Sequence, residues 1–347
     1  MPTHVTMADI ARRASVSVAT VSMSLRNKPN IPPVTRERIT ALARRMGYQP
    51  NPFVSALMRS RRRSQPPSSR PVLAFVCTSN RADGWRNSPL ATFRLARDSA
   101  RERTAQHGYQ CQEFWLYQDN MSADRFSRML HTRGIQGILL GPNLDGTPLP
   151  ALEWTFFSAV RIGMPSSAPA IPTICNDNFL ASVTLIEECH RRGYRRPGLV
   201  LQHAQNLRLQ RRWEGGFYTG RLNFPDFVQI NPLLLDEWPT LDVLRQWLKT
   251  EKPDVIITPA PDELLPHLRT LGLRVPEDIG LAHLACPERG NRFSGIYQNG
   301  RLLGTTAVDV LVGMVEQHKK GLPPQAVTSM VEGAWNPGST LRPLPRV

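Results

Sequence analysis

The chain has 347 residues, enough for about two domains, and its 41% hydrophobic content is ordinary for a globular protein. No run approaches the roughly 18 apolar residues of a membrane helix, and the N-terminus lacks the apolar core of a secretory signal, so we expect a cytoplasmic protein. Five scattered cysteines without a C-x-x-C pair argue against a disulfide framework or a zinc site. We expect no metal and no cofactor.

The formal charge of +15 is unevenly distributed along the chain. Residues 1–70 carry 13 basic and 2 acidic residues, a net charge of +11, whereas the remainder carries 30 and 26, a net charge of +4. A basic segment ahead of a nearly neutral body indicates a polyanionic partner for that segment. A disordered solubilising arm is the alternative, but residues typical of helix ends and the apolar periodicity within the segment disfavour it.

Three short helices are predicted near the N-terminus. Thr6 and Asp9 have the spacing of a capping box, so a first helix starts directly after Thr6. Ser17 can cap a second helix, Val18–Leu25. A third helix, Pro33–Met46, starts with a proline where the missing N–H costs nothing. We expect apolar side chains to close a small core between these helices: Ile10, Ala11, Ala14, Val21, Leu25, Val34, Ile39, Leu42 and Met46.

Two short helices joined by about three residues match the helix-turn-helix. In that geometry the N-terminal part of the second helix enters the major groove of DNA. The side chains expected to face the base edges are Val18, Ala19, Ser22 and Met23. Hydroxyl groups that can bind phosphate oxygens without carrying sequence information are those of Thr6, Ser17, Thr20 and Ser22.

A hinge and a linker follow this headpiece. Asn51 can cap a helix over Phe53–Met58, but a helix of under ten residues is marginal alone in water. The arginine run from Arg59 to Arg63 either neutralises phosphates or is a solvated linker, and we favour at least one DNA contact. A Pro/Ser stretch up to residue 70 is typical of an extended linker.

From residue 71 onward, short apolar runs alternate with amphipathic ones. The expected strands are Val72–Cys77, Gly137–Leu140, Ala159–Ile162, Gly198–Leu201, Asp254–Thr258 and Ile279–Leu284. The expected helices are Leu90–His107, Ser122–Arg133, Phe179–Arg192, Arg208–Leu222, Leu241–Lys249, Asp262–Leu271 and Leu302–His318. This alternation indicates parallel sheets covered by helices. Pattern alone does not decide between one doubly wound domain and two lobes.

The first 55 residues resemble the headpiece of the LacI/GalR family of transcription regulators. The resemblance is carried in order by Val5–Ala11, Val16–Ser22, Thr35–Ile39 and Gly47–Asn51. It adds Tyr48 and Asn51 to the expected DNA-binding residues. The family usually has Arg where this chain has Met23, and Asn where it has Arg26. Arginine is the commonest specific partner of guanine, so we expect an operator outside the commonest family pattern, with Arg26 contacting phosphate or base; alternatively, Met23 simply packs.

The resemblance also implies a function for the hinge. In the family, paired hinge helices of a dimer lie in the minor groove with a leucine wedged between base pairs, and Leu57 occupies that position. Such a wedge unstacks a base step and bends the duplex. Reading a two-fold operator needs two heads and the hinge helix needs a partner, so we expect a homodimer.

The rest of the chain resembles the family's periplasmic-binding-protein-like core of two α/β lobes. Matching stretches include Ala74–Ser79, Asn176–Asn178, Arg212–Gly215 and Pro253–Ile257. The expected fold is therefore a helix-turn-helix headpiece over residues 1–50, a hinge helix and linker over 51–70, and a core over 71–340. The first lobe would take about 71–172 and 298–325, and the second about 173–297 and 326–340.

In the family, effectors bind in the cleft between the lobes. Arg212 matches the arginine that grips such ligands, and Ser79 and Gln298 fall at pocket positions. Each has an alternative role, since Arg212 can pair with a carboxylate and Ser79 can cap a helix. The aspartate that binds ligand hydroxyls in the family is replaced by Ala285, which puts a sugar effector in doubt and leaves open DNA binding without an inducer.

These features favour a sequence-specific, dimeric repressor whose affinity for a palindromic operator is modulated by a small ligand. An α/β enzyme is the alternative, but no G-x-S-x-G, P-loop or metal-spaced cluster is present. A ligand-binding module without a DNA role is disfavoured by the headpiece. We therefore expect a protein that is not an enzyme.

Overall fold

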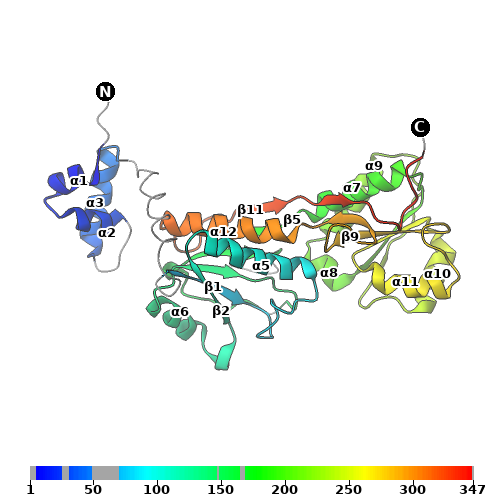
Figure 1. Cartoon of the computed structure of the whole chain (residues 1–347), viewed down its shortest axis with the longest axis horizontal. Helices are drawn as coiled ribbons and strands as arrows, with labels where there is room; N and C mark the ends of the chain where they lie inside the picture. The colour runs from blue at the N-terminus through cyan, green and yellow to red at the C-terminus, as the bar shows by residue number, and fades with distance from the viewer. Residues whose placement is uncertain (1–4, 26–30, 49–69, 147, 165–168, 346–347) are drawn as a thin grey trace.

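The computed structural model describes residues 5–25, 31–48, 70–146, 148–164 and 169–345. Within these ranges the chain forms a three-helix headpiece and two α/β lobes, each built on a six-stranded sheet (Figure 1). The expected combination of an all-α headpiece with a two-lobed α/β core is confirmed. None of the helices in these ranges combines the length and the hydropathy that a bilayer crossing requires.

The headpiece consists of α1 (Met7–Ala14), α2 (Val18–Leu25) and α3 (Pro33–Arg45). One buried cluster joins the three helices, and its members are Ile10, Ala11, Ala14, Val21, Ile39 and Ala43. Leu25, Leu42 and Met46 are half-buried against this cluster, as expected of core-facing positions. The expectation for Val34 is wrong, because its side chain is 78% exposed on the first turn of α3.

The first lobe contains a parallel sheet with the strand order β11-β5-β4-β3-β1-β2. Its strands are β1 (Val72–Cys77), β2 (Gln110–Trp115), β3 (Gly137–Leu140), β4 (Ser158–Ile162), β5 (Thr173–Asn176) and β11 (Thr328–Val331). Its α-helices are α5 (Ala91–Gln106), α6 (Ala123–Thr132) and α12 (Gly300–Glu316). Side chains of α5 and α12 enter one apolar cluster and those of α6 enter another, so helices cover both faces of the sheet.

Helices α5 and α12 lie against each other along their length (Figure 1). A Cβ atom at Gly304 would lie 2.0 Å from the carbonyl oxygen of Ala96. Only glycine therefore permits this close approach of the two helix backbones. Arg103 of α5 and His107, directly after α5, both bind the carboxylate of Asp309 on α12, which adds polar contacts to the packing.

The second lobe contains a sheet with the order β12-β10-β9-β8-β6-β7, in which β12 runs antiparallel to β10. Its strands are β6 (Pro197–Gln202), β7 (Leu233–Leu235), β8 (Val255–Thr258), β9 (Gly280–Cys286), β10 (Ser294–Tyr297) and β12 (Ala334–Asn336). Its helices are α7 (Asn178–Arg191), α8 (His203–Arg208), α9 (Arg212–Leu222), α10 (Leu241–Glu251) and α11 (Pro261–Thr270). Side chains of α7 and α9 enter one apolar cluster and those of α10 and α11 the other.

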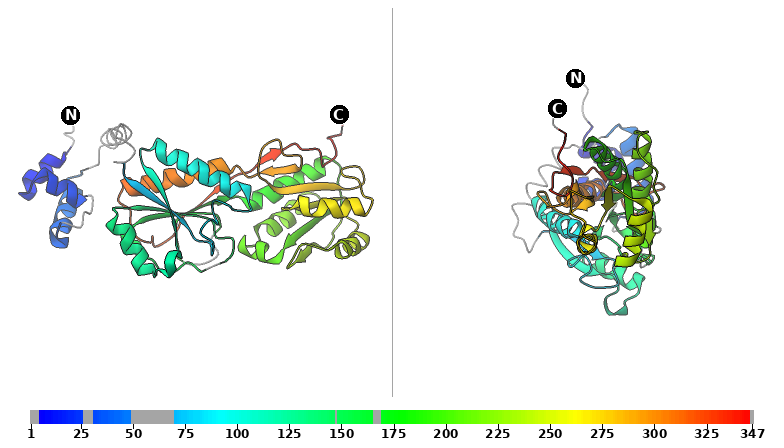
Figure 2. Two further views of the ribbon diagram at one scale, coloured as in Figure 1. Left: turned by 60° about the horizontal axis from the view of Figure 1, so that its bottom comes forward. Right: turned by 90° about the vertical axis from the view of Figure 1, so that its right-hand side faces the viewer.

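The described chain crosses between the two sheets three times: after β5, after β10, and between β11 and β12. The left view in Figure 2 shows the two lobes joined by these segments. The division expected at residues 172 and 325 gives β5 and β11 to the second lobe, and the topology corrects this. Strand β5 pairs with β4 and β11 pairs with β5, so both strands extend the first sheet.

Candidate nucleic-acid interface and inter-lobe site

The start of α2 is held by its own side chains. Ser17 Oγ accepts a hydrogen bond from the backbone N–H of Thr20 at 3.0 Å and lies 2.8 Å from Thr20 Oγ1. Val18 and Ala19 on the first turn are exposed, Val18 by 48%. Because both side chains are short, a duplex could approach this turn closely, as the recognition helix of a helix-turn-helix requires.

Ser22 and Met23, which we expected to face outward, are half-buried in the headpiece. Thr6 forms the predicted capping box: Thr6 Oγ1 accepts from Asp9 N at 3.3 Å and donates to Asp9 Oδ2 at 2.6 Å. Tyr48 packs against the headpiece core. The structure thus gives Thr6 and Tyr48 stabilising contacts within the headpiece, and their contacts with DNA stay predictions.

Four of the predicted DNA-binding residues lie outside the described residues: Arg26, Asn51, Leu57 and Arg59. The hinge helix and its leucine wedge therefore stay predictions from the sequence.

The surface of the headpiece is basic. Arg12 and Arg13 end α1, and Arg44 and Arg45 end α3; all four are exposed. The acidic Asp9 is committed to the capping box, where hydrogen bonds from Thr6 hold its pKa below the usual value. Exposed arginines at the ends of helices can neutralise the phosphates that flank a groove.

Three amide side chains meet where the chain passes between the lobes. Asn176 Nδ2 donates to the backbone oxygen of Gln298 at 2.6 Å, and Gln298 Nε2 donates to Asn178 Oδ1 at 3.0 Å. All three residues are buried. The contacts link the end of β5, the start of α7 and the residue after β10, so Gln298 connects two of the crossings.

Arg212 lies at the start of α9 and reaches across to the first lobe. Arg212 Nη1 approaches Met330 Sδ on β11 at 3.7 Å. Arg212 Nε is buried and has no hydrogen-bond partner among the described residues. The sequence predicts one helix over Arg208–Leu222, and this is wrong, because Gln210 and Arg211 take positive φ values and separate α8 from α9.

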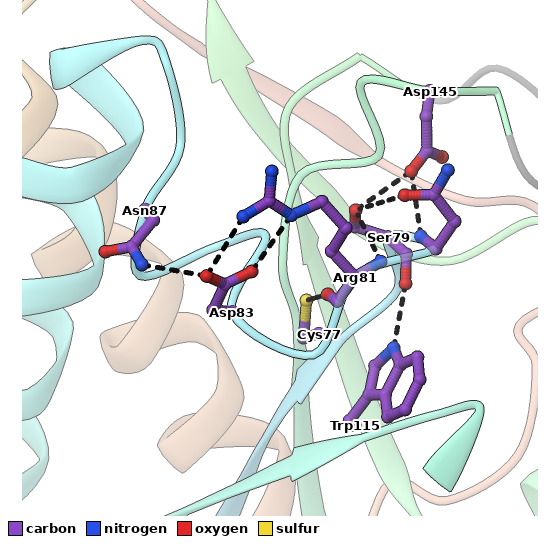
Figure 3. A network of polar contacts seen from close by, with 8 residues as sticks. Cys77, Ser79, Arg81, Asp83, Asn87, Trp115 and Asp145 are labelled. Carbon is purple, nitrogen blue, oxygen red and sulfur yellow. Dashed lines mark hydrogen bonds and ion pairs between the residues drawn. The ribbon is translucent and has the colours of Figure 1, made fainter.

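Ser79 follows β1 and belongs to a loop network (Figure 3). Ser79 Oγ donates to Asp145 Oδ2 at 2.9 Å, and Asn80 N donates to the same oxygen at 2.8 Å. Trp115 Nε1 donates to the backbone oxygen of Ser79 at 2.9 Å. Asp145 thereby fixes the loop after β1 to the loop after β3. Sequence reasoning missed Asp145, because the partners are 66 residues apart.

A cavity of about 200 Å³ lies beside the loop that follows β1. It is lined by Phe75, Cys77, Ala82, Trp85, Arg86, Arg97, Glu113, Phe114 and Trp115. Its charged groups satisfy one another, since Arg86 and Arg97 both bind the Glu113 carboxylate. Burial opposes ionisation of Glu113, but these arginines lower its pKa below the usual value. The cavity therefore presents no charge that lacks a partner.

A helix-turn-helix headpiece on two lobes that exchange three chain crossings defines a class: DNA-binding regulators with a periplasmic-binding-protein-like sensor. Comparison with known proteins agrees. The family model for bacterial regulatory proteins of the lacI family matches residues 6–51. The repressor CytR of Escherichia coli K12 is 24% identical over 80% of this chain and 79% of its own length. Catabolite control protein A of Priestia megaterium is 44% identical over 54 residues, 16% of each chain.

Solved structures agree on the fold. The transcriptional regulator CelR in complex with cellobiose superposes with a TM-score of 0.56 at 18% identity, covering 97% of this chain and 100% of that one. The lac repressor dimer bound to operator and the anti-inducer ONPF gives 0.54 at 18% identity, covering 98% and 100%. Residues 6–51 thus match the headpiece of the lacI family, and the rest of the chain shares the fold of these regulators. The proteins of known role that it resembles are transcription regulators.

Proposed function

We propose that the protein binds a palindromic operator as a homodimer and represses transcription, with an affinity for DNA that changes when a small ligand occupies the cleft between the lobes. Residues 1–50 would read the major groove, residues 51–70 would form the hinge and linker, and residues 71–340 would bind the ligand and the second copy. In this function the α/β core senses a ligand and performs no catalysis. The protein would act in the cytoplasm, where its operator lies.

The observation that carries the proposal is the exposed first turn of α2. Ser17 and Thr20 fix the helix start, and Val18 and Ala19 are left facing solvent within a basic headpiece. The proposed DNA contacts are Thr6, Ser17, Val18, Ala19, Thr20, Ser22, Met23, Arg26, Tyr48, Asn51, Leu57 and Arg59. The proposed effector contacts are Ser79, Arg212 and Gln298. An operator complex and a cellobiose complex among the structural neighbours support the same division of labour.

An acidic substitution on this turn tests the proposal. Ala19→Asp places a carboxylate against the phosphates and bases of the groove, and we expect a loss on the order of 1–3 kcal/mol in binding to a palindrome selected from random duplex. Ala41→Asp is the matched control, because Ala41 is exposed on α3 and the added charge is the same. Fluorescence anisotropy at several salt concentrations measures both variants.

The control should keep most of the wild-type affinity, and log Kd of the wild type should rise steeply with log salt, by roughly 0.9 per phosphate contacted. Equal losses in the two variants would place the reading surface elsewhere. If full-length protein at low ionic strength preferred no palindrome over random duplex, the proposed function would be wrong.

A further inference from the structure

The break between α8 and α9 places two arginines at neighbouring helix ends. Gln210 and Arg211 both have a φ of 55°, and Arg211 N donates to the backbone oxygen of Asn206 at 2.8 Å. Arg208 is the last residue of α8 and Arg212 the first of α9. Figures 1 and 2 show α8 on the side of the second lobe that is turned toward the first. The tight turn therefore places Arg208 and Arg212 at adjoining helix ends, and Arg212 faces the first lobe, because its Nη1 lies 3.7 Å from Met330 Sδ on β11.

The three arginines around this break differ in whether a carboxylate balances their positive charge. Arg211 is paired with Glu214, with 2.9 Å between Nη1 and Oε2, and Glu214 also accepts from Asn206 Nδ2 at 2.8 Å. For Arg208 and Arg212, no carboxylate of the described residues lies within ion-pair distance. The segments outside the described residues contain no aspartate or glutamate that could supply one. The positive charges of Arg208 and Arg212 thus have no aspartate or glutamate as a counter-charge in these parts of the chain.

Both uncompensated arginines are shielded from water. Arg208 is half-buried, and burial lowers the pKa of its guanidinium. Arg212 Nε is fully buried without an acceptor, and Arg212 Nη1 contacts a thioether sulfur, which is a weak acceptor. Because Met330 belongs to the first sheet, the Arg212 guanidinium lies between the lobes.

A buried charge is ordinarily paired, since an uncompensated one costs free energy. Guanidinium groups match carboxylates and phosphates, to which they donate two parallel hydrogen bonds. We propose that the ligand of the inter-lobe cleft is a small oxyanion, a carboxylate or a phosphate ester, whose negative group binds between Arg208 and Arg212. This inference rests on the proposed ligand-sensing function and adds its chemistry.

The test is thermal unfolding of the full chain with paired probes at constant ionic strength. Ribose 5-phosphate is compared with ribose, and succinate with succinamide, so that each anion has a neutral counterpart. We expect at least one anion to raise Tm by about 2 °C or more as its concentration passes its Kd. The arm that responds distinguishes phosphate from carboxylate. Equal stabilisation by an anion and its neutral counterpart, or no stabilisation by either anion, would overturn the proposal.

Two variants test the proposed anion site, and Tm of each is measured without and with the anion. Arg208→Met removes an uncompensated buried charge, so Tm of the ligand-free protein should rise and the response to the anion should disappear. Arg211→Met is the matched control: it breaks the ion pair with Glu214, so Tm should stay or fall while the response to the anion persists. A lower Tm in Arg208→Met would show that the protein itself compensates this arginine.

Operator binding is measured on the same samples in the absence of probes. Arg211→Met should bind operator as the wild type does, because the headpiece is untouched and Arg211 is paired with Glu214 outside the proposed anion site. A wild-type protein that responds to the anion but binds no operator would refute the regulatory function and leave the anion site intact.

Discussion

The headpiece and the inter-lobe face of the second lobe use their polar side chains in opposite ways. In the headpiece, Thr6 and Ser17 direct their hydroxyls to the backbone of their own helices, three residues away. At the break between α8 and α9, Arg208 and Arg212 have no counter-charge among the described residues. The start of α2 is thus stabilised by its own residues, whereas the two arginines at this break lack a counter-charge, as the proposed anion site requires.

The largest expected effect is the unfolding of the headpiece alone, with the two lobes left folded. Ile39 has 0% exposure at the centre of the headpiece core. Ile39→Ala should cost about 2–5 kcal/mol, since it leaves a cavity in a core of few residues. We expect operator binding to be lost while the sensor domain still unfolds at its usual temperature, as measured by anisotropy and calorimetry.

Val34→Ala on the same helix is the control, because Val34 is exposed and its truncation leaves no cavity. A sensor domain that melts earlier in Ile39→Ala would show that the two regions are energetically coupled.

The second expected effect is a loss of stability at low pH in the two-lobed core, which the headpiece should not share. His283 on β9 is buried, its Nδ1 accepts from Ala285 N at 2.9 Å, and burial lowers its pKa to about 4 from an ordinary 6.5, against a weak opposing effect of Asp262. Between these values the unfolded chain binds more protons than the native one, so stability falls as pH decreases. The expected loss is about 2 kcal/mol from pH 7 to pH 5.

Denaturant unfolding at several pH values measures this loss. His283→Asn keeps an acceptor near the Ala285 N–H and should flatten the profile, whereas His131→Gln on the exposed surface should leave it unchanged. Residues 5–48 contain no histidine, so headpiece stability should not follow the same curve. An unchanged pH profile in His283→Asn would assign the dependence to other groups.

The smallest effect concerns the capping box. Thr6→Ala removes the acceptor for Asp9 N and should lower headpiece stability by about 1 kcal/mol. Thr6→Ser retains the hydroxyl and should behave nearly as the wild type. Circular dichroism of the full chain would be dominated by the helices of the two lobes, so amide hydrogen exchange within α1 is the sensitive measurement. Equal exchange in both variants would mean that the cap is dispensable.

Local signals predicted the headpiece well. The capping box at Thr6 and the bounds of α2 were correct, because caps depend on residues three positions apart. The buried strands β1 and β3 were also predicted with their observed bounds, since runs such as Val72–Cys77 are continuously apolar. Edge and return strands were missed: β2 has a mixed polar pattern, β7 has three residues, and β11 is exposed over most of its length.

The inter-lobe site was predicted only in part. Arg212 and Gln298 came from the family resemblance, and the structure places both beside the chain crossings. The position of Arg208 at a helix end was not predicted, because the sequence pattern indicated one continuous helix, whereas Gln210 and Arg211 take left-handed backbone and end α8 at Arg208. Asn178 was within a matching stretch, but its bond to Gln298 joins residues 120 apart.

The sequence alone determined the headpiece, the alternation of strands and helices, and the uneven charge, because capping and apolar periodicity act over a few residues. Only the tertiary structure decided which sheet receives β5 and β11, how α5 meets α12 at Gly304, and which arginines lack a counter-charge. Those outcomes depend on groups brought together from distant parts of the chain, and no local pattern records such distances.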